Sequence, residues 1–209
     1  MVTVSVVIPT LNEEKNIGEC LDMLLPQRPD EVVVVDHSSD DHTAEIAKLY
    51  GARVYTLPHS ATLGELRQFG AEFATRDIVA TTDADARPPL GWIDRIRHRF
   101  SAEPDLMAIY GSVHDSSGNA LKTAWASFMP AFCPGTAANC AFRRDAFLRS
   151  DGYPAVMRGE DTAMFRNMAA VGRVAFDPKL TMGMELKDYW AGAPIVAGAI
   201  GYTLFKLFR

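Results

Sequence analysis

The sequence predicts one α/β domain with a mostly parallel β-sheet that carries helices on both faces. Two observations support this fold class. Short and nearly continuous apolar runs, such as Glu31–Asp36, are typical of parallel strands that are buried on both sides. Between these runs, apolar residues recur at helical spacing. The chain has 209 residues, of which 48% are hydrophobic, which is enough for one such core.

The first half of the chain alternates strands with helices. A helix is expected to begin at residues 10–13, where Thr10 and Glu13 have the spacing of a capping box, and to end at Pro26. Other helices are expected between residues 42 and 51 and over residues 63–73. The expected strands are residues 4–9, 31–36, 53–57 and the run that ends at Asp83.

The second half is less regular. Trp92, Ile93, Ile96 and Phe100 define one side of a helix over residues 90–100. The remaining expected elements are a strand at 106–111, a polar loop at 114–119, a short strand at 138–142, a helix at 159–170 and a strand at 174–177.

Polar, turn-rich loops follow three of the expected strands. The carboxyl ends of parallel strands form the edge of a sheet where ligands bind, so these loops should meet there. Asp83-Ala84-Asp85 follows one strand directly, and two carboxylates at this place can hold a divalent cation that also binds phosphate oxygens. The alternative is that one Asp is a turn residue and the other caps the next helix.

Charge and cysteine content limit the classes of function. The net charge of −5 argues against a nucleic-acid-binding protein, which needs a basic face. Cys20, Cys133 and Cys140 form no CxxC pair and no metal-binding spacing, as is usual in a reducing compartment. Each of them is expected to be a small buried residue.

Four motifs together resemble family 2 glycosyltransferases with the GT-A fold, over roughly residues 4–178. They are the run at residues 5–14, the run at 33–41, Asp83-Ala84-Asp85, and Gly159-Glu160-Asp161. The resemblance implies an inverting transfer of a sugar from a nucleotide diphosphate donor, with Mn²⁺ or Mg²⁺ as cofactor. The processive relatives carry Gln-x-x-Arg-Trp after the last motif, and its absence here favours transfer of a single hexose.

The resemblance also implies which residues bind the nucleotide sugar. Asp85 is expected to bind the metal directly, and Asp83 to contact the ribose or to reach the metal through water. Asp36 is expected to accept a hydrogen bond from the base, or else to cap the following loop. Leu11 and Glu13 should line the base and ribose side, although Leu11 could be a core residue and Glu13 could only complete a capping box. The full set is Pro9, Leu11, Glu13, Asp36, Ser38, Arg67, Asp83, Ala84 and Asp85.

The remaining implied roles concern the diphosphate and the acceptor. Arg67 is expected to face the diphosphate, and the alternative is a solvated helix residue. Asp161 is the expected catalytic base, since single-displacement transfer needs a carboxylate that accepts the proton of the acceptor hydroxyl. The alternative is that Asp161 is the N-cap of its helix. Glu160 could raise the basicity of Asp161 as a like charge, or bind acceptor hydroxyls.

Residues 1–186 are expected to form the transferase domain, and residues 187–209 an apolar segment that associates with a membrane. No charged residue lies between Tyr189 and Phe205. The alternative is a terminal helix packed on the domain or on a partner. A lipid or glycolipid acceptor at the cytoplasmic face of a membrane follows as an expectation, with GDP-mannose as the first choice of donor and UDP-glucose as the second. The competing functions are a metal-dependent nucleotidyltransferase and a non-catalytic nucleotide-sugar-binding module.

Overall fold

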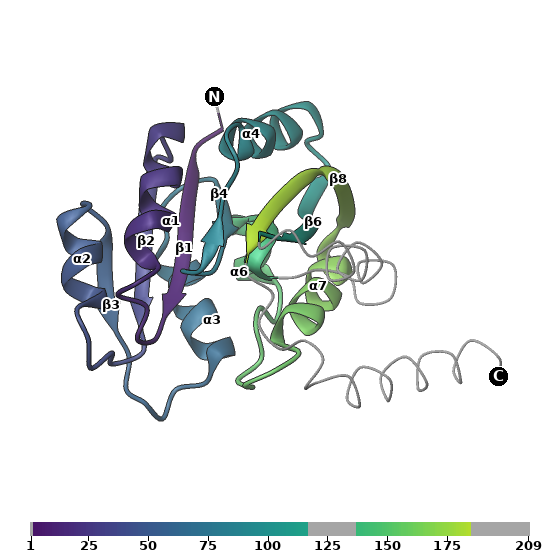
Figure 1. Ribbon diagram of the computed structural model, residues 1–209. Helices are drawn as coiled ribbons and strands as arrows, with labels where there is room; N and C mark the ends of the chain where they lie inside the picture. Colours follow the sequence, from purple (N-terminus) through teal and green to yellow (C-terminus); the bar gives the residue numbers. More distant parts are fainter. Residues whose placement is uncertain (1, 117–136, 185–209) are drawn as a thin grey trace.

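A central β-sheet with helices on both sides forms the computed structural model, which describes residues 2–116 and 137–184 (Figure 1). The strands are β1 (Val4–Thr10), β2 (Glu31–Asp36), β3 (Arg53–Thr56), β4 (Ile78–Thr81), β5 (Ala86–Arg87), β6 (Leu106–Asp115), β7 (Cys140–Arg143) and β8 (Arg173–Met184). The α-helices are α1 (Ile17–Leu24), α2 (Thr43–Leu49), α3 (Leu63–Phe73), α4 (Trp92–Ala102), α6 (Arg144–Arg149) and α7 (Glu160–Val171).

The sheet confirms the predicted α/β class. Within the described residues its strand order is β3-β2-β1-β4-β7-β6-β8-β5. β1 is parallel to both β2 and β4, and β2 is parallel to β3, so the first half of the chain builds a wholly parallel part. β7 interrupts the pattern because it is antiparallel to β4 and β6, whereas β6 and β8 are again parallel.

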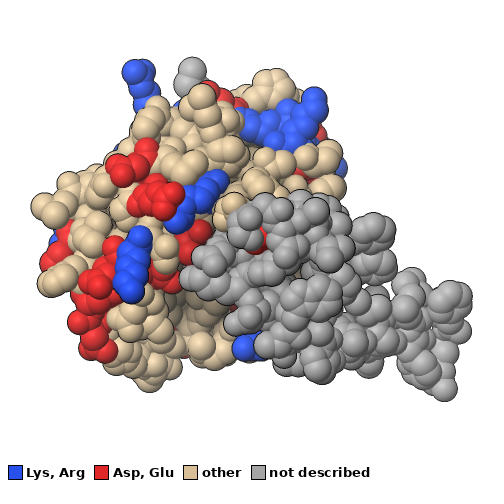
Figure 2. Space-filling model, in the orientation of Figure 1, with Lys and Arg blue, Asp and Glu red and all other residues tan. Residues whose placement is uncertain are grey.

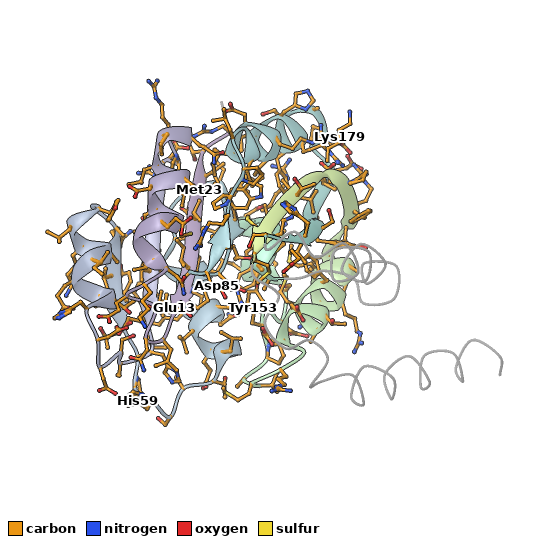
Figure 3. The ribbon with its side chains drawn as sticks, in the orientation of Figure 1. Glu13, Met23, His59, Asp85, Tyr153 and Lys179 are labelled. Carbon is orange, nitrogen blue, oxygen red and sulfur yellow. The ribbon has the colours of Figure 1, made fainter. Side chains whose placement is uncertain are left out.

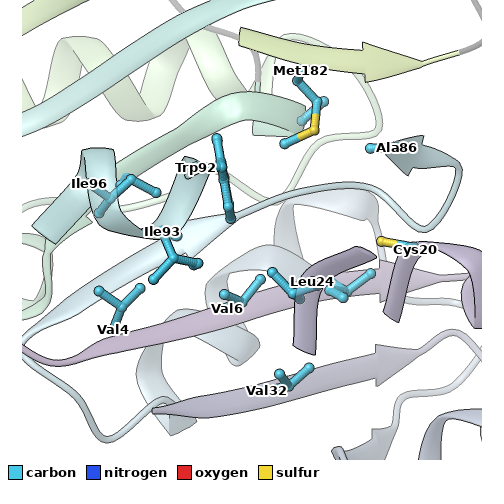
Figure 4. Close-up of a cluster of buried hydrophobic side chains, with 14 of the residues drawn as sticks. Val4, Val6, Cys20, Leu24, Val32, Ala86, Trp92, Ile93, Ile96 and Met182 are labelled. Carbon is cyan, nitrogen blue, oxygen red and sulfur yellow. The ribbon is translucent and has the colours of Figure 1, made fainter. Parts of the chain in front are cut away.

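Two apolar cores lie on opposite faces of the sheet. Side chains alternate along β1, so that Val4, Val6 and Ile8 belong to one core and Val7 to the other. α1 and α4 cover the first face, where Val4, Leu24 and Trp92 belong to one cluster (Figure 4). α3, α6 and α7 cover the second face.

Helix α3 positions one wall of the functional site, and local sequence fixes where it begins. The Thr62 hydroxyl accepts from the Glu65 amide, while the Glu65 carboxylate accepts from the Thr62 amide, which makes a complete capping box. A Cβ at Gly70 would lie 2.3 Å from Cγ1 of Val7, so only glycine lets α3 pack this closely on β1.

The helix predicted to begin at Thr10 is wrong. β1 extends through Thr10, and the Thr10 hydroxyl donates to Asp36 rather than capping a helix. The first helix begins only at Ile17, with Asn16 as its N-cap. The capping-box alternative for Glu13 therefore fails.

Two of the predicted strands of the second half, at 106–111 and 174–177, were too short, whereas the one predicted at 138–142 begins only at Cys140. β6 continues to Asp115, so the exposed His114 lies in a strand and not in the predicted polar loop. β8 runs from Arg173 to Met184, and the two strands extend together because they pair along most of their length. The short β5 was not predicted.

The whole of the expected membrane segment, residues 187–209, lies outside the described residues, as does Cys133. Among residues 2–116 and 137–184, no helix is long and apolar enough to cross a bilayer. Cys20 and Cys140 are free and buried, as predicted, and burial raises the pKa of each thiol to about 12.

On the face drawn in Figure 2, acidic side chains with several basic ones among them lie over the region of α1 and α2, and basic side chains gather over the region of α4. On the part of this face that the structure describes, the basic side chains form separate groups and not one continuous patch.

Candidate active site

A pocket of about 350 Å³ lies at the carboxyl ends of β1, β2 and β4. This is the edge of the sheet at which the sequence placed the ligand. Glu13 and Asp85 mark two of its walls in Figure 3. The pocket is lined by Pro9, Thr10, Leu11, Glu13, His37, Leu63, Leu66, Arg67, Asp83, Ala84, Asp85, Met157 and Met184.

Most of the predicted donor-site residues come together in this pocket. Pro9, Leu11 and Glu13 enter it from the end of β1, and Asp83, Ala84 and Asp85 from the end of β4. Leu11 is 45% exposed and is therefore not a core residue. Asp36, Ser38, Glu160 and Asp161 do not line the pocket.

Arg67 is buried behind Asp83 and is not the solvated helix residue of the alternative reading. Its NH2 group donates to Oδ1 of Asp83 at 2.7 Å, and its Nε lies 3.4 Å from Oε1 of Glu160. Only 4% of its side chain is exposed. Burial opposes the charge of Arg67, but the neighbouring Asp83 and Glu160 outweigh it and raise the pKa, so the guanidinium stays charged.

Asp36 is held inside the protein. Its Oδ1 accepts from the hydroxyls of Thr10 at 3.0 Å and Ser39 at 2.6 Å, and its Oδ2 accepts from the Ser39 amide at 2.9 Å. The side chain is 2% exposed. This is the loop-capping role of the alternative reading, and a contact with the base stays a prediction for which the loop would have to rearrange.

The next two residues have different positions. Ser38 has a positive φ of 55° and donates through its hydroxyl to the carbonyl of Leu57, so it fixes the loop. His37 lines the pocket, and its ring centroid lies 5.7 Å from that of His59. Among the described residues, Nε2 of His37 is enclosed without a hydrogen-bond partner. His37, which directly follows β2, is therefore a polar side chain of the pocket wall.

Glu160 and Asp161 form the first turn of α7. Gly159 is the N-cap, with a φ of 78°, so the N-cap alternative for Asp161 is wrong. The Asp161 carboxylate accepts from the amide of Thr162 at 2.7 Å and is partly exposed. Glu160 is 5% exposed, and burial raises the pKa of its carboxyl despite the opposing charge of Arg67.

The carboxylates that could hold a divalent cation are Asp83 and Asp85. Among the described residues, no group of three or more His, Cys, Asp or Glu side chains is arranged as a metal site. Oxygen ligands of this kind suit Mn²⁺ and Mg²⁺, provided that a substrate and water complete the coordination. The pair therefore fits a metal that binds together with a phosphorylated ligand.

Sequence reasoning missed Met157 and Met184, which enter the pocket from the loop before α7 and from the end of β8. Met157 is 60% exposed. No motif marks either residue, because both reach the pocket through long-range packing. A Cβ at Gly64 would lie 1.9 Å from the carbonyl oxygen of Pro154, so close contact with α3 fixes the position of the loop that carries Met157.

Known proteins share both the sequence family and the fold. The family model described as "Glycosyl transferase family 2" matches residues 5–170. A mannosyltransferase from Pyrobaculum calidifontis, solved with GDP-Man and Mn²⁺, is similar in structure, with a TM-score of 0.70 and 23% identity over 90% of this chain and 58% of that chain. The fold is the GT-A fold, as the resemblance implied.

Curated relatives match over part of their length. A 4,4'-diaponeurosporenoate glycosyltransferase from Staphylococcus haemolyticus is 37% identical over 90 residues, which are 40% of this chain and 24% of the relative. An undecaprenyl-phosphate 4-deoxy-4-formamido-L-arabinose transferase from Pseudomonas paraeruginosa is 29% identical over 192 residues, 86% of this chain and 53% of the relative. The chain thus spans about a quarter of the first relative and about half of the second.

Proposed function

The chain belongs to glycosyl transferase family 2, and we propose that it is an inverting, non-processive enzyme that moves one hexose from a nucleotide diphosphate sugar to a lipid or glycolipid acceptor. The observation that carries the proposal is the shared pocket of Asp83 and Asp85 with Pro9, Leu11 and Glu13. Carboxylates beside an apolar wall suit a ligand that has both a metal-bound diphosphate and a flat base.

The donor would lie across the ends of β1 and β4. Pro9 and Leu11 offer apolar surface to the base, and the Glu13 carboxylate can accept hydrogen bonds from the ribose. Asp85 and Asp83 would hold Mn²⁺ or Mg²⁺, which when bound neutralises charge on the departing diphosphate. GDP-mannose is the first choice of donor, supported by the GDP-Man in the Pyrobaculum structure, and UDP-glucose is the second.

Arg67 and Glu160 would act as positioning residues. The Arg67 guanidinium holds one oxygen of Asp83, and Glu160 holds Arg67 from the other side. This contact links the carboxylate of the donor site to the first turn of α7, on which Asp161 lies. The donor and acceptor sides of the site would therefore keep a fixed distance and orientation during the reaction.

Asp161 would be the catalytic base. In the proposed step the acceptor oxygen forms a bond to the anomeric carbon while the bond from that carbon to the diphosphate oxygen breaks. The acceptor hydroxyl proton goes to the Asp161 carboxylate, and the bonding electrons leave with the nucleoside diphosphate. Attack from the side opposite to the leaving group inverts the anomeric centre.

A lipid acceptor is supported by the rim of the pocket and by one relative. Met157 lines the pocket and is 60% exposed. A large exposed apolar side chain suits an acceptor with an apolar part. The Pseudomonas relative is named as an undecaprenyl-phosphate transferase. We place the enzyme at the cytoplasmic face of a membrane, with residues 1–186 as the transferase domain and residues 187–209 as the associating segment.

The first test is thermal stabilisation by GDP and by UDP, each with and without Mn²⁺. A ligand that binds only the folded state raises its stability. We expect a shift with one nucleotide that depends on Mn²⁺ and is lost in Asp85→Asn. The matched control is Asp94→Asn, because Asp94 is an exposed carboxylate on α4 outside the pocket.

A transfer assay then separates the proposal from its alternatives. We expect the folded protein to release nucleoside diphosphate from the sugar donor, and Asp161→Asn to bind nucleotide but to transfer poorly. Nucleotide binding without turnover would favour the non-catalytic module. Release of inorganic diphosphate from a nucleoside triphosphate and a sugar phosphate would favour the nucleotidyltransferase.

A further inference from the structure

A second cavity, of about 540 Å³, lies at the edge of the sheet opposite the donor pocket. It lies beside the starts of β1 and β4, whereas the donor pocket lies at their ends (Figure 1). At about 3.3 Å per residue, β1 separates the two sites by roughly 20 Å. The charged side chains that line the cavity are Arg76, Asp77, Arg143, Arg144 and Asp145.

None of the three arginines forms an ion pair with a carboxylate in residues 2–116 and 137–184. Arg143 donates only to backbone carbonyls. Arg144 donates to the carbonyl of Glu72 at 2.8 Å, while its Nε is enclosed without a partner. The exposed side chain of Arg76 makes no hydrogen bond to the described residues. The Arg143 guanidinium lies over the Phe100 ring at the end of α4, and that of Arg144 lies at the end of α3, so the two flank the cavity from opposite faces of the sheet. The donors of the exposed Arg76 guanidinium remain available to a ligand.

The two carboxylates of the cavity are occupied by other partners. Oδ2 of Asp77 accepts from the amide of Thr3 at 2.9 Å and from its hydroxyl at 2.7 Å. Asp145 accepts from Arg149 at 2.9 Å. These hydrogen bonds lower the pKa of both carboxyls, which stay charged and satisfied. The cavity therefore has one more positive charge than negative charges.

We propose that this cavity binds a phosphate group through Arg76, with Arg143 and Arg144 adding positive charge from its two sides. A guanidinium group matches phosphate oxygens with paired, charge-assisted hydrogen bonds, and further positive charge nearby strengthens the binding of an anion. The phosphate can belong to a soluble metabolite or to a lipid headgroup. The site is separate from the donor pocket and does not rest on the proposed transferase activity.

Calorimetric titration of the full chain with inorganic phosphate, in EDTA to remove divalent cations, tests the proposal. Arg76→Glu reverses one charge without removing a hydrogen bond of the fold, so folding should be retained. We expect it to weaken phosphate binding by at least about tenfold, and Arg76→Lys to retain most of the affinity. The matched control is Arg166→Glu, because Arg166 is exposed on α7 and lines neither pocket.

Flotation with vesicles of neutral lipid and with vesicles that contain phosphatidic acid identifies the source of the phosphate. Phosphate binding that depends on Arg76, without vesicle binding that depends on Arg76, supports a soluble ligand. Dependence on Arg76 in both assays supports a headgroup. The proposal is overturned if inorganic phosphate does not bind, or if Arg76→Glu binds it as tightly as the wild type.

Discussion

Replacing Arg67 by Met should strongly destabilise the protein. The substitution keeps much of the side-chain length but leaves Asp83 and Glu160 without the cation that lies between them, at 2.7 Å and 3.4 Å. Loss of one partner from a buried ion pair costs about 3–5 kcal/mol. In a chain of this size each kcal/mol lowers Tm by about 2–4 °C, so Tm should fall by roughly 6–20 °C.

The loss of stability in Arg67→Met should depend on pH, and the structure determines in which direction. Burial raises the pKa of Glu160 above its ordinary value of 4.5, and Arg67 opposes this rise. In Arg67→Met the opposition is gone, so the folded-state pKa rises further. The folded variant then binds more protons than the unfolded chain, and its unfolding free energy falls as pH rises from 4.5 through the raised pKa. The difference in unfolding free energy between the variant and the wild type should therefore be smallest in acid.

Urea denaturation followed by circular dichroism, without nucleotide, measures this gap at neutral pH and at the ordinary pKa of Glu160. Arg166→Met is the matched control, since this exposed arginine forms no side-chain hydrogen bond or ion pair with the described residues, and we expect a change within about 0.5 kcal/mol. A gap for Arg67→Met below about 1 kcal/mol at neutral pH would refute the burial argument. An equal gap at both pH values would refute the role of Glu160.

Three further predictions concern the base, the donor-side loop and the core. Asp161→Asn should lower kcat by about 10²–10⁴ with little change in the KM for the donor, and a loss confined to KM would contradict its role as base. Asp36→Ala should cost about 1–3 kcal/mol in urea denaturation, because it leaves the Ser39 amide and two hydroxyls without their acceptor. Trp92→Phe should cost about 1–3 kcal/mol, because Oδ1 of Asn139 loses the indole donor at 2.8 Å, and steady-state transfer by the folded variant should be unchanged.

The parallel part of the fold could be predicted because its signals are local. β2 has the predicted bounds, since a run of valines between polar residues fits a strand buried on both faces. α3 was predicted equally well from the spacing of Leu63, Leu66, Phe69 and Phe73. The apolar stripe of α4 is buried as its spacing indicated.

The failures arose where a distant partner decides the outcome. Thr10 and Glu13 have the same spacing as Thr62 and Glu65, but only the second pair caps a helix. The Thr10 hydroxyl instead finds Asp36 on the neighbouring strand, and no local pattern contains that contact. The lengths of β6 and β8 likewise follow from their mutual pairing.

The candidate site was predictable to the extent that motifs lie at strand ends. Asp83 and Asp85 reach the pocket because β4 ends just before them. Asp36 also follows the rule for strand ends, yet its carboxylate turns to the hydroxyls beside it. Met157 shows the reverse case, a pocket residue whose position depends on the close contact of its loop with α3.

The central position of β1 affects how the pocket behaves before a ligand arrives. From Ser5 to Val7 both edges of this strand are paired, and both of its faces are covered by the two cores. Amides in such a strand should exchange with deuterium only when the whole domain unfolds, unlike amides in the short edge strand β3. Pro9, which has no amide hydrogen, and Thr10 follow directly at the end of β1, where they pair with Val35 and Asp36 of β2. A nucleotide that binds against them meets a wall that is already ordered, which favours affinity without prior rearrangement of that wall.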